Sequence, residues 1–488
     1  MTLLVTLWWL GFLTAVGLCA GSFLNVIIYR VPRDQSLRDP LWSACPVCGH
    51  RIRWYDNLPV LSFLFLRGRC RDCRRPIASR YLVIELAMAL IVLVLLDAFL
   101  IGRVRGGLGT TLFNLTERLA FDWPILAAHV ILFGCLLSLA AIDLEHYWVD
   151  IRFTNYAVAA GFILHMCWTP SYPGQATAWF RPSPVLATAA VLALAGLTVT
   201  WLYLVFQTAL ALAVQPDDEA DDLGAPPPGP ADSEHPTPRP PRRGLAWLTA
   251  WVALALFLAL VAVDGLGTKL PHAPRALLPL GLFFLLILQQ SSIPREADEW
   301  IVTAIEEERG SARTMVIEEL LWLLPAVALG AFGIWLAAGN TEVAARITDL
   351  WRQEFPIPAV APLRHWAPLT GLATAAAGYV VAGALGWAVR IFFTLLFGRE
   401  AFGTGDIHLM AAVGCVAGWP VAVLGFIVTC VLALAGWLAT LPFKRTRAIP
   451  LGPWLALACL TVTVFYDRIV AWPLLSRTLD ACRMLLRG

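Results

Sequence analysis

Long apolar runs with few charges restrict the fold of this chain more than any other feature of its sequence. An apolar helix needs about 17–25 residues to cross a bilayer. Runs of about that length or more occupy residues 3–28, 81–102, 124–142, 153–170, 183–213, 244–264, 273–290, 316–338, 366–396, 420–442 and 449–471. Charged residues make up only 14% of the chain, against about a quarter in soluble domains. The sequence therefore predicts an all-α polytopic membrane protein, a multi-helix bundle surrounded by the lipid bilayer.

The overall charge gives no sign of a nucleic-acid partner. The formal net charge of the 488-residue chain is only +2. Binding to a phosphate backbone needs a basic patch or groove, often with aromatic residues among the basic ones, and the sequence has no such pattern. We therefore expect no nucleic acid among the partners.

The loop between the first two apolar runs predicts the orientation in the membrane. Residues 29–80 contain eleven arginines but only four aspartates. Short loops rich in arginine stay on the cytoplasmic side of a membrane. We therefore expect this loop to face the cytoplasm and the N-terminus to face the opposite side.

The same loop carries two pairs of cysteines, each with the spacing C-x-x-C. The pairs are Cys45 with Cys48 and Cys70 with Cys73. Two such pairs at this separation are typical of a zinc ribbon, because four thiolates suit a tetrahedral ion. A pair of disulfides is the alternative, which a reducing cytoplasm disfavours. The sequence thus predicts a small cytoplasmic zinc-ribbon-like loop with a structural Zn²⁺ that has no open coordination position.

The middle of the chain has a different composition. Residues 215–243 contain an acidic block, a proline-rich block and almost no large apolar side chain, which predicts a disordered linker. Residues 294–320 mix charged with apolar side chains, which predicts a helix lying at the membrane surface. Together with the neighbouring apolar runs, these segments predict a large helical insertion at 171–365.

Two aspartates lie where apolar runs meet polar sequence. Asp143 lies at the end of a run, in LAAIDLEHYWVD, and Asp406 follows a glycine turn in FGTGDIHLM. Ionisable residues at such positions are costly and usually functional. If folding brings the two carboxylates together, they can share one proton and activate water, as in an aspartic protease. Gly403 and Gly405 would let an extended substrate approach the backbone. The alternative is that Asp406 is only the N-cap of a helix.

Four stretches of the sequence resemble the prepilin peptidases, which are membrane aspartic peptidases. They are AGSFLNVIIYRVPR at 20–33, the cysteine loop at 45–81, LAAIDLEHYWVD, and FGREAFGTGDIHL followed by IPLGPWLAL. The resemblance implies that Asp143 and Asp406 are the catalytic pair, with the GxGD motif around the second. It also implies cleavage of a type IV prepilin or pseudopilin leader after a glycine, at the cytoplasmic face of the bacterial inner membrane.

The resemblance implies a second activity as well. In the family, the N-terminal region with the zinc loop is credited with methylating the new N-terminus, with S-adenosylmethionine as the donor. Gly21, Ser22, Asn25 and Arg30 are then the candidate methyltransferase residues. Their alternative roles are tight helix packing for the small residues and placement of a charge at the membrane surface for the arginine.

The predicted organisation follows from these stretches. Residues 1–122 hold the first span, the zinc loop and the second span, and form the methyltransferase-like region. Residues 123–170 and 366–488 are the two halves of the peptidase core. The insertion at 171–365 lies between them, so that the two aspartates are 263 positions apart. Such an insertion is tolerable if its ends lie close together, because loop entropy grows slowly with length.

The chain departs from the family pattern near both motifs. The family usually has proline and then Asp or Asn at the seventh and eighth positions after the first catalytic aspartate, where this chain has Asp150 and Ile151. Asp150 is therefore not carried over as catalytic. Ala401 and Phe402 replace a Gly-Met pair, and His408 replaces the usual lysine.

Two other classes of function stay open at this point. A transporter would also keep paired acids in its spans, although the sequence has no visible inverted repeat. A non-catalytic assembly factor would keep the spans and the zinc loop without needing Asp143 and Asp406. The presence of both acids favours the enzyme.

Overall fold

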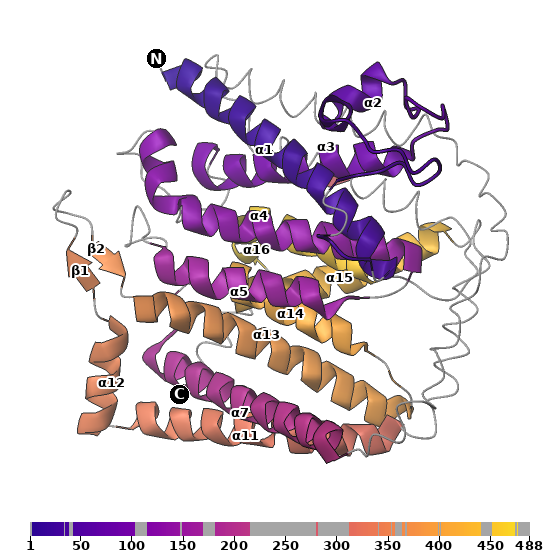
Figure 1. Ribbon diagram of the computed structural model, residues 1–488. Helices are drawn as coiled ribbons and strands as arrows, with labels where there is room; N and C mark the ends of the chain where they lie inside the picture. The colour runs from indigo at the N-terminus through magenta and orange to yellow at the C-terminus, as the bar shows by residue number, and fades with distance from the viewer. Residues whose placement is uncertain are drawn as a thin grey trace.

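The protein is a bundle of long helices in a computed structural model (Figure 1). The structure describes residues 2–102, 115–168, 181–214, 280–281, 312–356, 364–440, 451–473 and 476, except for positions 34, 39–41, 147–148, 340, 353, 367, 399 and 401. The predicted linker at 215–243 and the apolar runs at 244–264 and 273–290 lie outside the described residues, apart from 280–281.

The first third of the chain forms four long helices and one loop. Helix α1 (Thr2–Arg30) leads through a short 3-10 turn η1 (Val31–Arg33) into the cysteine loop, which contains η2 (Trp54–Asn57) and α2 (Leu61–Phe65). Helix α3 (Ser79–Leu96) runs on into a π-helical turn η3 (Asp97–Ile101). Helices α4 (Leu115–His146) and α5 (Ile151–Cys167) follow.

The described part of the insertion contributes a helix pair and a small cap. Helices α7 (Pro184–Val214) and α11 (Ala312–Ala338) pack along each other, and α12 (Glu342–Arg352) lies across their ends (Figure 1). Strands β1 (Glu354–Pro356) and β2 (Arg364–Trp366) pair antiparallel, with Phe355 opposite His365. This short hairpin is the exception to an otherwise all-α prediction within the described residues.

The last part of the chain completes the bundle. It forms α13 (Pro368–Phe397), α14 (Thr404–Ala417), α15 (Trp419–Thr440) and α16 (Gly452–Val470). Helix α14 packs against α13, α5 and α4, and α16 packs against α15 and α4. Segments that are more than 200 positions apart in sequence therefore form one central body.

The helices have the length and composition of a multi-pass membrane protein. Within the described residues, eight helices are long and apolar enough to cross a bilayer: α1, α3, α4, α7, α11, α13, α15 and α16. The predicted run at 153–170 forms α5, which has 17 residues and is too short to be counted with them. Helix α14 has only 14 residues and was not among the predicted spans.

One predicted element differs in kind. The segment 294–320 was expected to form a separate surface helix, but its described part, residues 312–320, is the first portion of the continuous helix α11. The charged side chains of this segment are therefore part of a candidate span that extends beyond its apolar stretch.

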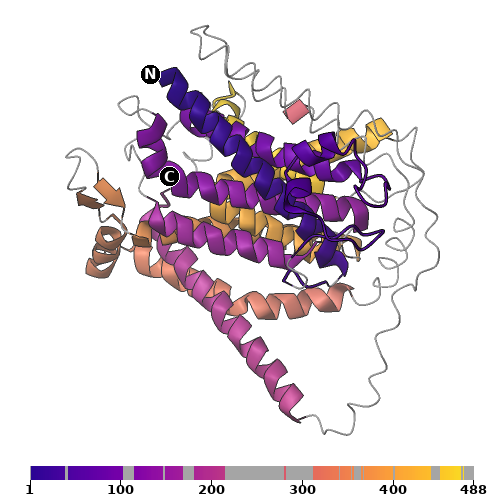
Figure 2. The same cartoon turned by 45° about the horizontal axis from the view of Figure 1, so that its top comes forward.

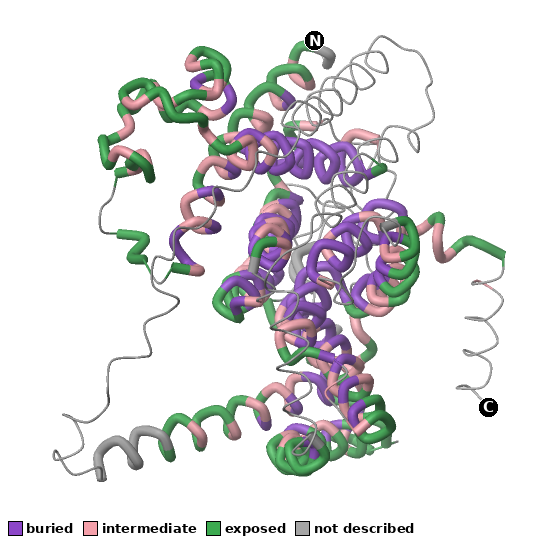
Figure 3. Tube along the Cα trace, turned by 90° about the vertical axis from the view of Figure 1, so that its right-hand side faces the viewer, coloured by how far each residue is buried: buried purple, intermediate pink, exposed green. Residues whose placement is uncertain are grey.

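Burial is concentrated in the centre of the bundle. Residues 84–100 are all buried, which makes α3 a helix enclosed by protein (Figure 3). Tight crossings without side chains allow this packing: a Cβ on Gly17 or Gly21 would lie 2.6 Å from the Cα of Ala89 or Glu85 in α3. This small-xxx-small spacing is a common contact between membrane helices. The second half of α7, in contrast, projects away from the bundle (Figure 2) and carries exposed apolar side chains such as Trp201 and Phe206.

The two ends of the bundle differ. The cysteine loop with α2 lies at the right-hand end in Figure 1, and α12 with the β-hairpin lies at the left-hand end. Because α4 starts at the left and ends at the right, its last turn lies at the same end as the cysteine loop (Figure 1). The candidate site is built at that end.

Candidate functional site

Asp143 lies in the last turn of α4 and is directed at the start of α16. Its side chain is buried, with 6% exposure, and its Oδ2 accepts a hydrogen bond of 2.8 Å from the backbone N–H of Gly452. A Cβ on Gly452 would lie 2.8 Å from the same oxygen, so a larger residue there would push the carboxylate away. The N-terminus of α16 thus holds the Asp143 carboxylate, as free amides at helix starts hold anions.

Asp406 is the third residue of α14 and does not cap the helix. Gly403 occupies the N-cap position, with φ −66° and ψ 143°, and the helix has no side-chain cap hydrogen bond. The alternative interpretation of Asp406 as an N-cap is therefore wrong. A Cβ on Gly403 would lie 3.3 Å from Asp406 Oδ2. The glycine leaves room for the half-buried carboxylate, which remains available for another task.

A second glycine brings the two acid-bearing segments together. A Cβ on Gly405 would lie only 2.8 Å from the Cβ of Val149, which follows α4 in the chain. The first turn of α14 is thus pressed against the segment just after Asp143. Asp143 and Glu400 are both close enough to Asp406 to repel its negative charge. The folded chain therefore places the two predicted acids as neighbours, although 263 positions separate them.

The other acids near Asp143 have structural partners. Asp150 caps α5, since its Oδ1 accepts a 2.8 Å hydrogen bond from the N–H of Arg152, and it also forms a 2.7 Å ion pair with that side chain. Glu145 forms a 2.6 Å ion pair with Arg80 at the start of α3. These contacts agree with leaving Asp150 out of the catalytic pair, and they tie the end of α4 to the exit of the cysteine loop.

The four cysteines of the loop meet as a cluster. The Sγ atoms of Cys45, Cys48, Cys70 and Cys73 all lie within 4.8 Å of one another, and those of Cys45 and Cys73 are 3.9 Å apart. A tetrahedral ion with Zn–S bonds of about 2.3 Å separates its sulfurs by about 3.8 Å. The cluster can therefore hold a metal ion, and its donors and spacing fit Zn²⁺.

The two cysteine pairs sit in nearly identical turns. In the first, the N–H of Cys45 donates to His50 O and that of Gly49 donates to Cys45 O. The second repeats this pattern 25 positions later, with donation from Cys70 to Arg75 O and from Arg74 to Cys70 O. Gly49 and Arg74 occupy the same left-handed position, with φ of 71° and 59°. The same backbone turn thus carries each pair of sulfurs.

Side chains outside the cluster support the loop. Arg71 donates from Nε and Nη2 to the two oxygens of Asp56, at 2.7 and 2.5 Å. This hydrogen-bonded guanidinium holds the pKa of Asp56 below its usual value. In the first C-x-x-C pair, burial opposes ionisation of the Cys45 thiol. Hydrogen bonds, among them those from the backbone of Cys48 and Val47, outweigh this effect and lower the pKa of Cys45 to about 7.

The methyltransferase candidates contact two different parts of the N-terminal region. Gly21 is in backbone contact with Glu85 of α3, Ser22 hydrogen-bonds the same Glu85, and Asn25 donates a 2.9 Å hydrogen bond to Tyr81 O. Arg30 donates instead to the carbonyl oxygens of Ser36 and Trp42 in the loop. Among the described residues, these contacts fit helix packing and loop anchoring. A role for the four residues in methyl transfer stays a prediction.

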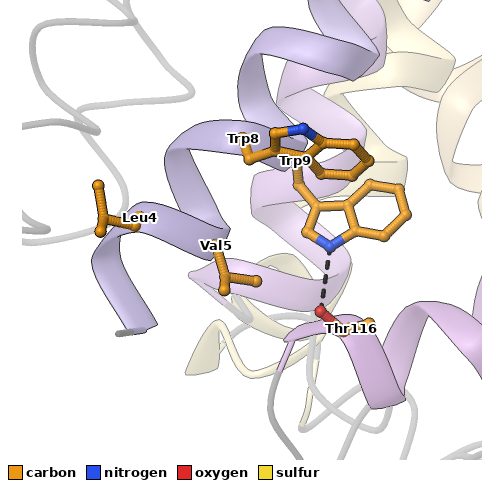
Figure 4. Close-up of a pocket in the computed structure, with 5 residues that line it drawn as sticks. All are labelled: Leu4, Val5, Trp8, Trp9 and Thr116. Atoms are coloured by element: carbon orange, nitrogen blue, oxygen red, sulfur yellow. Dashed lines mark hydrogen bonds between the residues drawn. The ribbon is translucent and has the colours of Figure 1, made fainter.

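A described pocket lies away from these groups. It has a volume of about 330 Å³ and is lined by Leu4, Val5, Trp8, Trp9 and Thr116, near the starts of α1 and α4 (Figure 4). Trp9 Nε1 donates a 3.1 Å hydrogen bond to Thr116 Oγ1 across it. Its lining is mostly apolar and it contains no carboxylate, so we assign the chemistry to the opposite end of the bundle.

Three residues at this end of the bundle were not singled out from the sequence. Gly452 lies in a stretch noted only as the closing span, and Val149 is an ordinary apolar residue. Arg390 did carry a signal, because it is a lone charge inside the apolar run 366–396 and such charges are usually functional.

Comparison with known proteins gives this geometry a family context. Residues 15–99 match the family described as the bacterial peptidase A24 N-terminal domain. The chain is 34% identical over 205 residues to a prepilin leader peptidase/N-methyltransferase of Klebsiella pneumoniae, an alignment that covers 41% of this chain and 75% of the relative. It is 39% identical over 153 residues to the protein of that name in Myxococcus xanthus, which covers 31% of this chain and 39% of the relative.

A third relative carries a related name. The type 4 prepilin-like proteins leader peptide-processing enzyme of Escherichia coli is 35% identical over 199 residues, or 36% of this chain and 60% of the relative. The chain spans 39%, 33% and 33% of the lengths of the first three curated relatives that it matches. No solved structure matches. Because the chain covers three quarters of the Klebsiella relative at 34% identity, it belongs to the prepilin leader peptidase/N-methyltransferase family.

Proposed function

We propose that this protein is a membrane aspartic endopeptidase that uses Asp143 and Asp406 as its catalytic pair. The observation that carries the proposal is the meeting of the two acids at one end of the bundle, where Asp143 acts electrostatically on Asp406. Family membership supports the same activity.

The two carboxylates would act on one water molecule without a covalent intermediate. Two like charges at close range cannot both ionise cheaply, so the pair holds one shared proton. The ionised member takes a proton from water as that water attacks the scissile carbonyl carbon, and the protonated member donates to the carbonyl oxygen. The N–H of Gly452 keeps the Asp143 carboxylate in place during these transfers. Because the pair titrates as a unit, neither aspartate is assigned as the base.

The substrate we propose is a type IV prepilin or pseudopilin precursor, cut after the glycine that precedes its apolar helix. The relatives' names include prepilin leader peptide processing, and the site lies at the end of a bundle of candidate spans. The apolar helix of such a precursor would remain in the bilayer while its leader reaches the two acids. We place the protein in the bacterial inner membrane, with the cysteine loop and the acids facing the cytoplasm, because the loop is rich in arginine.

Two further properties belong to the proposal. Cys45, Cys48, Cys70 and Cys73 would hold Zn²⁺, which would fix the fold of the loop and take no part in hydrolysis, since four thiolates fill its coordination. Methylation of the new N-terminus, with S-adenosylmethionine as donor, is supported by the relatives' names. No step of that reaction follows from the contacts of Gly21, Ser22, Asn25 and Arg30.

The test is a cleavage assay in membranes with a prepilin-like precursor. Asp143→Asn and Asp406→Asn should each reduce cleavage by about 10³-fold or more, because each removes one proton-transfer group. Asp150→Asn is the matched control, since asparagine also caps helices well and Asp150 lies outside the proposed pair; it should cleave like the wild type. All proteins are compared at equal amounts of membrane-inserted protein.

The opposite results would redirect the assignment. Cleavage by either Asp→Asn variant at the wild-type rate would make that aspartate structural. A wild type that binds the precursor without cutting it would favour an assembly factor, and proton-coupled solute uptake into vesicles would favour a transporter.

A further inference from the structure

Arg390 is a buried arginine that joins the insertion to the segment in front of Asp406. It lies in α13, within a candidate span, with 3% of its surface exposed. A guanidinium at such a depth is costly unless its donors are matched by acceptors. The proposed hydrolysis assigns no task to this residue, so its contacts need their own explanation.

The first contact of Arg390 is with the insertion. Its Nε donates to both oxygens of Glu319 at 3.0 and 3.2 Å, and its Nη2 forms a 2.9 Å ion pair with the same carboxylate. Glu319 belongs to α11 and is itself largely buried, with 12% exposure of its side chain. Another contact between α13 and α11 lies nearby and does not involve Arg390. A Cβ on Gly398, at the end of α13, would be 3.6 Å from the guanidinium of Arg313 in α11.

The second contact of Arg390 is with the segment that leads into α14. Its Nη1 donates to Glu400 and, at 2.6 Å, to the backbone carbonyl oxygen of Phe402. Phe402 immediately precedes Gly403, the N-cap of α14, and Asp406 follows three residues later. The guanidinium therefore fixes the backbone just before the helix turn that carries the catalytic acid.

The planar shape of the side chain matters here. The guanidinium of arginine presents five N–H donors in a fixed fork, whereas lysine offers one compact charge. One edge of Arg390 faces Glu319 of α11, and Nη1 faces Glu400 and Phe402 O. Only a rigid fork satisfies both sides at once, so the position of α11 and the position of the segment 400–403 depend on each other.

From this geometry we infer that Arg390 is a positioning residue through which the insertion helix α11 sets the placement of Asp406. The inference rests on the proposed peptidase function, and it gives the insertion a task in that reaction. Glu319 holds one edge of the guanidinium, and Glu400 and the Phe402 carbonyl are held by its other side. Small displacements of a catalytic group cost about 10²-fold in rate. The site should therefore lose activity when the Glu319–Arg390 ion pair is broken.

The experiment measures cleavage by the full-length protein, with kcat and KM determined separately. Glu319→Gln keeps the shape of the side chain but removes its charge, and it should lower kcat by about 10-fold or more with KM unchanged, because the contact of Glu319 with this region runs through Arg390. Arg390→Lys should lower kcat at least as much, since lysine cannot bond to Glu319 and to Glu400 with Phe402 O at the same time. Glu342→Gln is the matched control, because Glu342 pairs with Arg346 on the exposed surface of α12 in the same insertion; it should match the wild type.

A double mutant separates positioning from general stability. If Glu319 acts through Arg390, adding Glu319→Gln to Arg390→Met should lower kcat no further. Equal kcat for Glu319→Gln and Glu342→Gln, or additive losses in the double mutant, would overturn the inference. If Glu319→Gln fails to insert into membranes, Glu319→Asp replaces it, because it keeps the charge but draws it back by one methylene. An inactive wild type would contradict the proposed function instead, which keeps the two failures distinguishable.

Discussion

The aspartate site and the cysteine loop lie at the same end of the bundle but are held by different forces. Asp143 and Asp406 are placed by helix ends that approach through glycines, as at Gly452 and Gly405. The loop has little apolar burial, with Trp54, Leu58 and Phe65 exposed. It depends instead on four sulfurs, short backbone turns and the Asp56–Arg71 ion pair.

The two acids are thus placed by helix packing, whereas the cysteine loop is held by polar bonds and by the sulfurs that can bind a metal. Where two backbones touch at a glycine there is no room for a side chain, so an added methyl group displaces a whole helix end. A loop held by a metal and a few polar bonds can lose its order while the bundle around it stays folded. The two regions should therefore respond to different perturbations.

Metal removal should have the largest effect, and only on the loop. The purified protein should contain zinc, and Cys45→Ser should abolish its retention. Structural zinc contributes on the order of 10 kcal/mol to small zinc-binding domains, so residues 42–78 should become sensitive to protease after treatment with a chelator. The thermal transition of the bundle should change little. Simultaneous loss of the bundle's transition would show that the two regions fold as one unit.

A methyl group at Gly405 should have the next largest effect, and only on the aspartate site. The new Cβ of Gly405→Ala would meet Val149, and relief of such overpacking costs about 1–3 kcal/mol. Cleavage should fall about 10-fold or more with zinc content unchanged. Val149→Ala in the same chain should restore much of the activity by making room.

The matched control for this test is Gly11→Ala, since a Cβ on Gly11 meets nothing within 4 Å. It should leave cleavage at the wild-type level. If Val149→Ala does not rescue Gly405→Ala, the glycine serves the substrate directly, as the sequence first suggested, and not the packing of α14.

The smallest effect should come from the ion pair of the loop. Asp56→Asn removes the charge that Arg71 stabilises, and we expect zinc affinity in a chelator competition to fall by about two- to fivefold. The pKa of Asp56 is lowered in the folded loop, so its contribution is complete above the unfolded value of about 3.9 and is lost only as the pH falls through the lower folded value. The ratio of wild-type to variant affinity should thus be constant between about pH 6 and 8. A ratio that varies in this range would assign the effect to another group.

Much of the site was predictable because its parts are local patterns. C-x-x-C pairs define sulfur positions by short turns, and the four cysteines meet as expected. Apolar run length predicted the described long helices, with boundaries that differ mainly where charged turns extend them, as at Ala312 in α11. Asp143 and Asp406 stood out because each is an acid at the end of an apolar run.

The remaining features depend on contacts that local patterns do not contain. Helix α14 escaped the span prediction because its 14 residues are fewer than a bilayer crossing needs. Glu319 and Arg390 are 71 positions apart, and nothing in either segment indicates the other. In the sequence, Gly452 looks like any glycine at the start of a helix. Only the structure shows that its backbone nitrogen lies 2.8 Å from Asp143 Oδ2.

The contact between α13 and α14 bears on how a substrate reaches the acids. Gly378 of α13 and Gly414 of α14 face each other backbone to backbone, so closely that a Cβ on either one would collide with the other. On its far side α13 is covered by α7 and α11, which cross tightly at Gly196 and Gly333. Among the described helices, this flank is therefore closed by backbone-to-backbone crossings. Under the proposed function, a precursor helix is expected to enter from another face of the bundle, so that the insertion would set its direction of entry.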